Sequence, residues 1–119
     1  LADPSPPAGQ WLVYLGDDDV FMQGAFDAIR AGIAAQQEPH PLMFRARLYP
    51  SATRRCYQPI ILWRDPVMEA GNVTAQNIVC PNDAGKLGAW GNDVAFMAGT
   101  VEAYAGACDW RTEVITECH

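Results

Sequence analysis

Three consecutive aspartates, Asp17, Asp18 and Asp19, follow a short apolar run and are the residues best suited to chemistry. In an extended chain alternate side chains point the same way, so Asp17 and Asp19 share one side and Asp18 faces the other. Two carboxylates at this spacing offer hard oxygen ligands to one divalent cation and leave positions for water and phosphate. The spacing therefore predicts a Mg²⁺ or Mn²⁺ site with Asp17 and Asp19 as its two ligands.

The same aspartates also allow a structural interpretation. Carboxylates near the amino end of a helix are stabilised by its dipole, and a helical pattern follows directly. In this interpretation Asp17 to Asp19 form a polar turn that caps the helix. The pattern of residues leaves both interpretations open.

The elements on either side of the aspartates have clear periodicities. The continuous apolar run Trp11–Leu15 is typical of a strand buried on both faces of a mostly parallel sheet. After the aspartates, apolar residues at spacings of four, three and four predict a helix whose stripe packs in the core, namely Met22, Phe26, Ile29 and Ile33. The aspartates are thus expected at a strand's carboxyl end, where open α/β sheets bind ligands.

The rest of the chain mixes strand and helix patterns. Residues 42–48 alternate between apolar and polar, which indicates a strand with one wet face. Further strands are expected at 60–63, 73–79 and 113–118, a short helix at 84–87, and a helix over 94–104 that is capped at Asn92-Asp93 and ends at Gly106. The fold class is therefore α/β or α+β.

Composition limits the classes of function. The 119 residues suffice for one domain, and 50% hydrophobic with 18% charged residues is ordinary for a globular protein. A net charge of -6 argues against broad nucleic-acid binding. No apolar run reaches the roughly 18 residues of a membrane span, and no secretory signal is visible, so we expect a cytoplasmic protein.

Two further features concern the chain ends and the cysteines. The chain starts at Leu1 with loop composition, so we expect residues 1–10 to be a linker at a truncated start. The four cysteines form no C-x-x-C pair, which argues against a zinc ribbon. We expect reduced, partly buried thiols; a disulfide between Cys108 and Cys118 across a hairpin is the alternative.

Five segments taken in order resemble GT-A-fold glycosyltransferases, with the large inverting "family two" group the nearest. An apolar strand enters Gly16-Asp17-Asp18-Asp19 and a helix opens after it, as in the D-x-D segment of that fold. Residues 71–79 resemble the family's glycine loop and the strand after it, and residues 81–88 its short helix ending in glycine. Residues 91–96 resemble its x-E-D motif, although Asn92 replaces the acid, and residues 117–119 its late histidine.

The resemblance implies a fold and an activity. The chain would be the C-terminal half, residues 11–119, of a GT-A-like domain with a mixed sheet flanked by helices, and the N-terminal nucleotide-binding half would be missing. It would transfer a sugar from a nucleotide-sugar donor to a hydroxyl acceptor with Mn²⁺ or Mg²⁺, and this fragment alone would be inactive. Expected partners are the donor, the acceptor, and either the missing half or a second copy, without nucleic acid and without a transmembrane segment.

The resemblance also assigns roles to particular residues. Asp17, Asp19 and His119 would hold the metal, and Asp93 would be the general base that takes the acceptor's proton. Substrate would be bound by Asp18, Gly71, Asn72 and Trp90.

Each role has a structural alternative. Asp93 is equally explained as a helix N-cap, Gly71 as a turn glycine and Trp90 as a core residue. Two other functions remain open for the whole chain: a non-catalytic binding or assembly module that retains the fold, and a metal-dependent phosphoryl-transfer or hydrolase domain.

Overall fold

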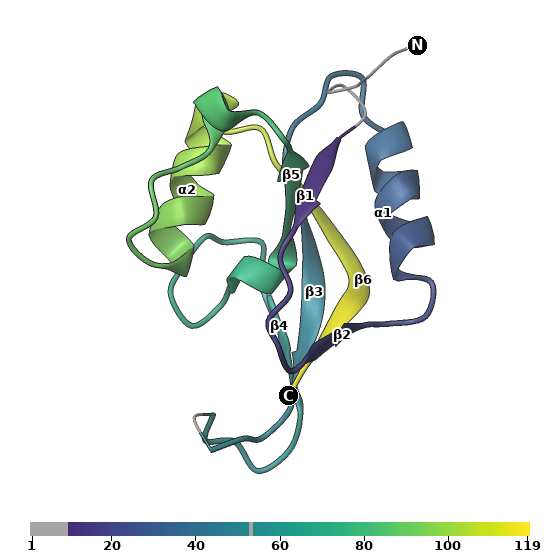
Figure 1. Cartoon of the computed structure of the whole chain (residues 1–119), viewed down its shortest axis with the longest axis vertical. Helices are drawn as coiled ribbons and strands as arrows, with labels where there is room; N and C mark the ends of the chain where they lie inside the picture. The colour runs from purple at the N-terminus through teal and green to yellow at the C-terminus, as the bar shows by residue number, and fades with distance from the viewer. Residues whose placement is uncertain (1–9, 53) are drawn as a thin grey trace.

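A single mixed sheet with one helix on each face forms the body of the molecule (Figure 1). The computed structural model describes residues 10–52 and 54–119. The predicted linker over residues 1–10 lies outside this part of the chain, apart from Gln10. The mixed sheet and its two helices confirm the predicted α/β class.

The sheet has six strands in the order β1-β5-β3-β6-β2, and β4 pairs with β3 beside this path. Strands β3 and β6 are parallel, and every other pairing is antiparallel. The elements in chain order are β1 (Trp11–Val13), β2 (Asp19–Phe21), α1 (Ala25–Ala34), β3 (Leu42–Leu48), β4 (Ile60–Leu62), the 3₁₀ turn η2 (Ala75–Asn77), β5 (Ile78–Pro81), the 3₁₀ turn η3 (Ala84–Lys86), α2 (Asp93–Ala103) and β6 (Asp109–Cys118).

Strand β3 supplies both faces of the core because its side chains alternate. Leu42 and Phe44 pack with Ala25 and Ile29 of α1 on one face. Met43 packs with Phe96 and Met97 of α2 on the other, together with Trp63 and Ile78. The bounds predicted for this strand are confirmed. On the face expected to be solvent-exposed, Met43 is buried under α2, and only Arg45 and Arg47 are partly exposed.

The two helices form where the sequence predicts them, with one correction. Asn92 caps α2 by accepting a hydrogen bond from the Ala95 N–H at 2.9 Å, as expected. Helix α1 begins at Ala25, after Gly24 in a left-handed conformation (φ 82°). Phe26 is therefore 48% exposed, and Met22 lies before the helix. The predicted core stripe is confirmed for Ile29, which is buried, and for Ile33, which is partly buried against the same cluster, but not for Met22 and Phe26.

Two strand predictions are corrected. The run from Trp11 gives only the three-residue β1, which lies at the edge of the sheet and is partly exposed, not buried on both faces. The strand expected over 73–79 starts at Ile78, because η2 occupies residues 75–77. Two polar amides, Gln76 and Asn77, interrupt the apolar pattern there.

The chain between β1 and β2 places the aspartates. β1 lies at one edge of the sheet and β2 at the other, so residues 14–18 cross from one edge to the other beside the carboxyl ends of β3 and β6 (Figure 1). A turn closed by the Asp19 N–H on the Gly16 carbonyl at 3.1 Å ends this crossing. The crossing curls the sheet and brings Asp19 opposite Cys118.

Two remaining predictions can be compared with the structure. All four cysteines are free. Cys108 directly precedes the ten-residue β6 and Cys118 is its last residue, so the two lie about 30 Å apart at strand spacing, too far for a disulfide. Among the described residues no helix is long and apolar enough to cross a membrane.

Candidate functional site

Asp19 is held in place by two donors on a single oxygen. Its Oδ2 accepts hydrogen bonds from the Gly16 N–H at 2.8 Å and from Gln76 Nε2 at 3.0 Å. The Cys118 thiol lies against the same carboxyl group. Because all of these donors are neutral, the negative charge of Asp19 is oriented but not balanced.

Gly16 makes this arrangement possible. A side chain at this position would place its Cβ 2.8 Å from Asp19 Oδ2, closer than real Cβ atoms approach a neighbour. The absence of a side chain lets the carboxylate fold back onto the backbone. The glycine before the aspartates thus determines the geometry of the third aspartate.

Asp93 lies at the first turn of α2 and is not its cap, which is Asn92. Its Oδ2 accepts the Ala75 backbone N–H at 3.0 Å. The N-cap interpretation of Asp93 is therefore wrong. Its carboxylate reaches away from its own helix to another element.

The turn η2 contacts both carboxylates. Gln76 donates to Asp19 and the neighbouring Ala75 N–H donates to Asp93, each at 3.0 Å. The turn is fixed by Asn77, which is fully buried and donates to the Phe44 and Leu62 carbonyls at 2.8 and 3.0 Å. One rigid turn thereby joins Asp19 to Asp93, although the two lie 74 positions apart in the sequence and Asp19 lies 57 positions from Gln76.

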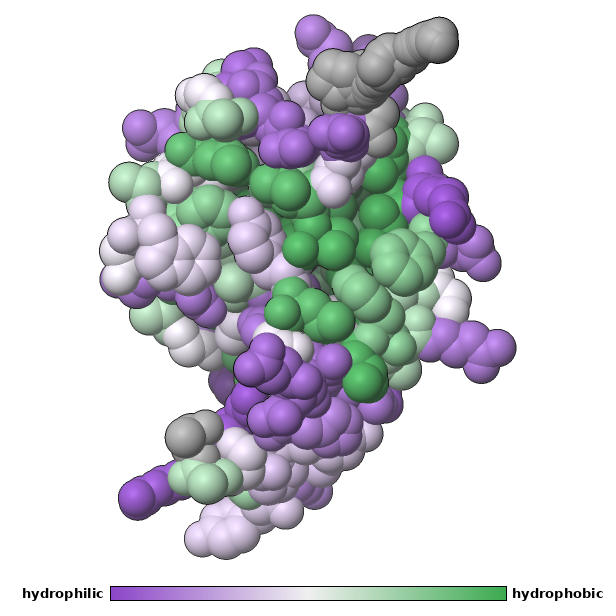
Figure 2. Space-filling model, in the orientation of Figure 1, coloured by the Kyte–Doolittle hydropathy of each residue, from purple (hydrophilic) through white to green (hydrophobic). Residues whose placement is uncertain are grey.

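The other two aspartates, Asp17 and Asp18, occupy the turn before β2 and are exposed. The aspartates do not cap α1, whose N-cap is Gly24 without a side-chain bond. The capping interpretation is therefore wrong. Apolar surface gathers on the face that carries β1 (Figure 2), and Leu15 and Val20, which flank the aspartates, are 44% and 50% exposed.

His119 follows Asp19's strand partner Cys118 but is directed elsewhere. Its ring stacks on Tyr49, with centroids 4.6 Å apart and planes at 9°. Its Nε2 lies 3.7 Å from Glu117 Oε1. In this arrangement His119 is grouped with Glu117 and Tyr49, and not with Asp17 and Asp19.

Gly71 and Asn72 shape the loop that leads to η2. Gly71 has a left-handed backbone (φ 83°) in open space, as a turn requires. The Asn72 side chain accepts from the Arg64 N–H at 2.8 Å and donates to the Asp65 and Val67 carbonyls at 2.7 and 2.8 Å. Both ends of its amide are used within the loop, so Asn72 acts on the site by ordering the chain before η2.

Trp90 is a surface residue. It is 59% exposed, and its ring lies 4.8 Å from that of Phe96, which in turn contacts Tyr14 at 5.3 Å. These rings connect the first turn of α2 with the segment that leads to the aspartates. Trp90 precedes Asp93 by three residues and presents an exposed aromatic ring.

The donor set fits a hard divalent cation only in part. Carboxylate oxygens are suitable ligands for Mg²⁺ or Mn²⁺, and such ions keep water and phosphate as further ligands. Among the residues described, no three Asp, Glu, His or Cys side chains are grouped so as to hold a metal ion. Asp19 and the exposed Asp17 are the two carboxylates here that could take part in holding such an ion.

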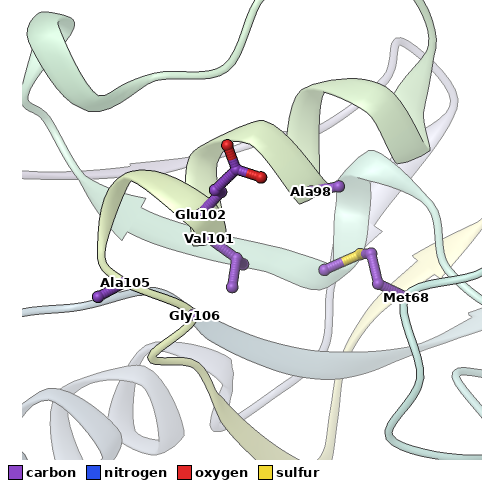
Figure 3. Close-up of a pocket in the computed structure, with 6 residues that line it drawn as sticks. All are labelled: Met68, Ala98, Val101, Glu102, Ala105 and Gly106. Atoms are coloured by element: carbon purple, nitrogen blue, oxygen red, sulfur yellow. The ribbon is translucent and has the colours of Figure 1, made fainter.

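An apolar cavity of about 330 Å³ lies elsewhere, between Met68 and the second half of α2 (Figure 3). Its lining comprises Met68, Ala98, Val101, Glu102, Ala105 and Gly106. Val101 is eight residues after Asp93 on the helix, about 12 Å at 1.5 Å per residue. Glu102 is the one charged residue in this lining. None of the aspartates lines the cavity, so it is separate from the candidate site.

Sequence reasoning missed Gln76, Asn77 and the Ala75 N–H. The available signal was the pair of amides inside an otherwise apolar segment, since polar residues in a central strand need partners.

Comparison of the chain with protein-family models, with curated proteins and with solved structures finds no match.

Proposed function

We propose that this chain functions in a metal-dependent glycosyltransferase of the GT-A-like kind, using Mn²⁺ or Mg²⁺ and a nucleotide-sugar donor. The observation that carries the proposal is the contact of one turn, η2, with both Asp19 and Asp93. These are the two residues to which the sequence resemblance assigns the cation and the acceptor's proton. Two acids with separate roles must be held at a fixed separation, which a short rigid turn provides.

Asp19 would hold the cation, with Asp17 as the second ligand. The cation, when bound, offsets the charge that develops on the leaving nucleoside diphosphate. Neutral donors on Oδ2 orient the Asp19 carboxylate without competing for its charge, as the outer hydrogen bonds of metal ligands do.

Asp93 would take the proton of the acceptor hydroxyl, and the exposed ring of Trp90 would support the sugar. The carboxylate has no positive partner: among the described residues no Lys, Arg or His lies within 4.0 Å of it.

The test is a calorimetric titration of the chain with Mn²⁺, and with pyrophosphate, the part of the donor that the cation would hold, in the presence and absence of Mn²⁺. We expect Mn²⁺-dependent binding that is lost in Asp19→Ala and retained in Asp83→Ala, an exposed aspartate at η3. Equal binding by wild type and Asp19→Ala would refute the role of the cation.

A non-catalytic binding module is the second candidate. It is favoured by the exposed apolar side chains of Leu15 and Val20 on either side of the aspartates, because exposed apolar surface is typical of interaction sites. Under this alternative the chain binds neither Mn²⁺ nor Mn²⁺-dependent pyrophosphate, so the same titration distinguishes the two.

A further inference from the structure

Three strands of the described sheet, β1, β2 and β4, have a neighbouring strand on one side only. An open strand edge carries unpaired N–H and C=O groups that pair readily with another chain, and charged side chains are a common protection against this. The β2 edge is protected, because Asp19 lies in the strand and Asp17 and Asp18 precede it. In β4 the last carbonyl, that of Leu62, already accepts a hydrogen bond from the Asn77 side chain at 3.0 Å.

The edge of β1 has neither kind of protection. Residues 10–15 include no charged side chain, and all three residues of the strand are partly exposed. Outside the strand pairing, neither Trp11 nor Val13 forms a backbone hydrogen bond to another described residue. Leu15, just beyond the strand, is 44% exposed, and apolar surface gathers on the face that carries β1 (Figure 2). Such an uncharged apolar edge is suited to pairing with a further strand.

The register of β1 on β5 determines which of its backbone groups face outward. The Asn82 N–H donates to the Gln10 carbonyl at 3.1 Å, so these two residues are a hydrogen-bonded pair. Bonded and non-bonded pairs alternate along an antiparallel ladder. Leu12, two residues after Gln10, is therefore also bonded to β5, whereas Trp11 and Val13 direct their N–H and C=O groups to the open side.

This outward pattern is complementary to itself. When a second copy of β1 lies antiparallel to the first with the two Leu12 residues opposite each other, Trp11 lies opposite the partner's Val13, and each such pair exchanges two hydrogen bonds. The side chains also match, because Trp11 and Val13 both pack on the α1 side of the sheet and Leu12 packs on the α2 side. Each Trp11 then lies beside a valine, an aromatic and β-branched pair of the kind that stabilises sheets.

We propose that β1 is the interface of a homodimer in which two copies join their sheets through Trp11–Val13, antiparallel and centred on Leu12. The two-fold axis is perpendicular to the sheet, so both α1 helices cover one face of the joined sheet and both α2 helices cover the other. The assembly closes at two copies, because each chain uses its one β1 edge. This interface is independent of the cation proposed at Asp19.

Sedimentation equilibrium over about a hundredfold range of protein concentration tests the interface. We expect wild type to form a reversible dimer and Val13→Pro to dimerise at least about tenfold more weakly, because two hydrogen bonds between the copies are lost. The Val13 N–H faces the open side, so proline removes no bond to β5. Val13→Thr keeps the N–H and the branched shape, and as the matched control it should dimerise within about threefold of wild type.

A cysteine pair tests the register. Leu12→Cys places two thiols opposite each other at a non-bonded position of the joined sheet, where the Cα atoms lie about 4.5 Å apart, within reach of a disulfide. Mild oxidation should therefore give a dimer linked through position 12, identified by mass spectrometry of the unreduced peptides. Val20→Cys, at the 50% exposed position on the β2 edge, is the control and should remain mostly monomeric.

Each outcome supports or overturns the proposal. A wild-type chain that stays monomeric overturns it, and the β1 edge is then free for a different partner. A dimer that Val13→Pro leaves as strong as in Val13→Thr overturns it too, because the copies then join elsewhere. Equal crosslinking of Leu12→Cys and Val20→Cys, or assemblies larger than two, contradict the two-fold pairing. Circular dichroism verifies folding, and Leu12→Cys supplies the test if Val13→Pro is unfolded.

Discussion

The two ends of the sheet hold carboxylates in opposite ways. At the amino ends of β3 and β6, Asp109 accepts from His40 Nε2 at 2.9 Å and from Gln36 Nε2 at 3.1 Å. The His40 Nδ1 lies 2.9 Å from the Glu38 carbonyl, and Gln36 also donates to the His40 carbonyl. Each group in this cluster meets a partner of complementary charge or polarity.

At the other end, Asp19 and Asp93 are bound only by neutral donors from Gly16, Gln76 and Ala75. No positive side chain among the described residues pairs with them. Both ends use hydrogen bonds to orient a carboxylate, but only the Asp109 end also supplies compensating charge. The Asp109 cluster is a set of mutually paired polar groups that stabilises the fold, whereas the proposed cation site lies at the end whose carboxylates lack compensating charge.

The most severe disruption of the uncompensated end should come from Asn77→Ala. The substitution leaves the buried Phe44 and Leu62 carbonyls without their donor and releases η2. We expect a loss of about 3 kcal/mol in the free energy of unfolding, measured by urea denaturation. Asn82→Ala is the matched control: among the described residues its exposed amide bonds to the Gln10 side chain, and the substitution should change the free energy of unfolding by less than about 0.5 kcal/mol. Similar losses in both variants would contradict the anchoring role of Asn77.

Asp19→Asn and Asp109→Asn should produce opposite results. In Asp19→Asn the carbonyl oxygen of the introduced amide can still accept from Gly16 and Gln76, so the unfolding free energy should change by less than about 0.5 kcal/mol. Loss of the charge should nevertheless weaken Mn²⁺ binding by more than about tenfold. Asp109→Asn should leave Mn²⁺ affinity unaltered. Mn²⁺ electron paramagnetic resonance titrations measure both, and equal affinities in the two variants would remove the distinction between the ends.

Gln76→Ala should have a smaller effect on the same measurement. It removes one of two donors that orient Asp19 Oδ2, while the Gly16 N–H remains. We expect Mn²⁺ affinity to fall roughly fivefold, the equivalent of about 1 kcal/mol. Gln37→Ala, at an exposed position after α1, is the control. A change in Gln76→Ala no larger than in this control would show that Gly16 alone suffices.

The pH dependence of stability should report the compensated end. Partial burial acts to raise the pKa of Asp109, but hydrogen bonds from His40 and Gln36 and the charges of His40 and Arg111 outweigh it, so the pKa is lowered. A lowered pKa in the folded state stabilises the fold above the ordinary value of 3.8, and this contribution is lost as the pH falls through the folded value.

Asp109→Asn should therefore be less stable than wild type at neutral pH, by less than about 1 kcal/mol because the side chain is 44% exposed. The difference should disappear in acid, once Asp109 is protonated in both states. Urea denaturation at a series of pH values measures it. A difference that persists in strong acid would mean that the effect is not electrostatic.

Local patterns predicted many of the elements well. The period of two gave β3 with its bounds, and Asn92 identified the start of α2, because periodicity and capping depend on neighbours in the sequence. The amino end of α1 was predicted less well. Gly24 provides a backbone cap that the apolar spacing of Met22 and Phe26 does not reveal.

For the candidate site, the sequence by itself determined which residues carry charge: Asp17, Asp18 and Asp19 beside a glycine, and Asp93 at a helix start. Only the tertiary structure decided that Asp19 and Asp93 are joined through η2, while His119 lies against Tyr49 and Glu117. Those contacts link residues far apart in the chain. They depend on how the segment between β1 and β2 crosses the sheet, and no local pattern of side chains encodes that path.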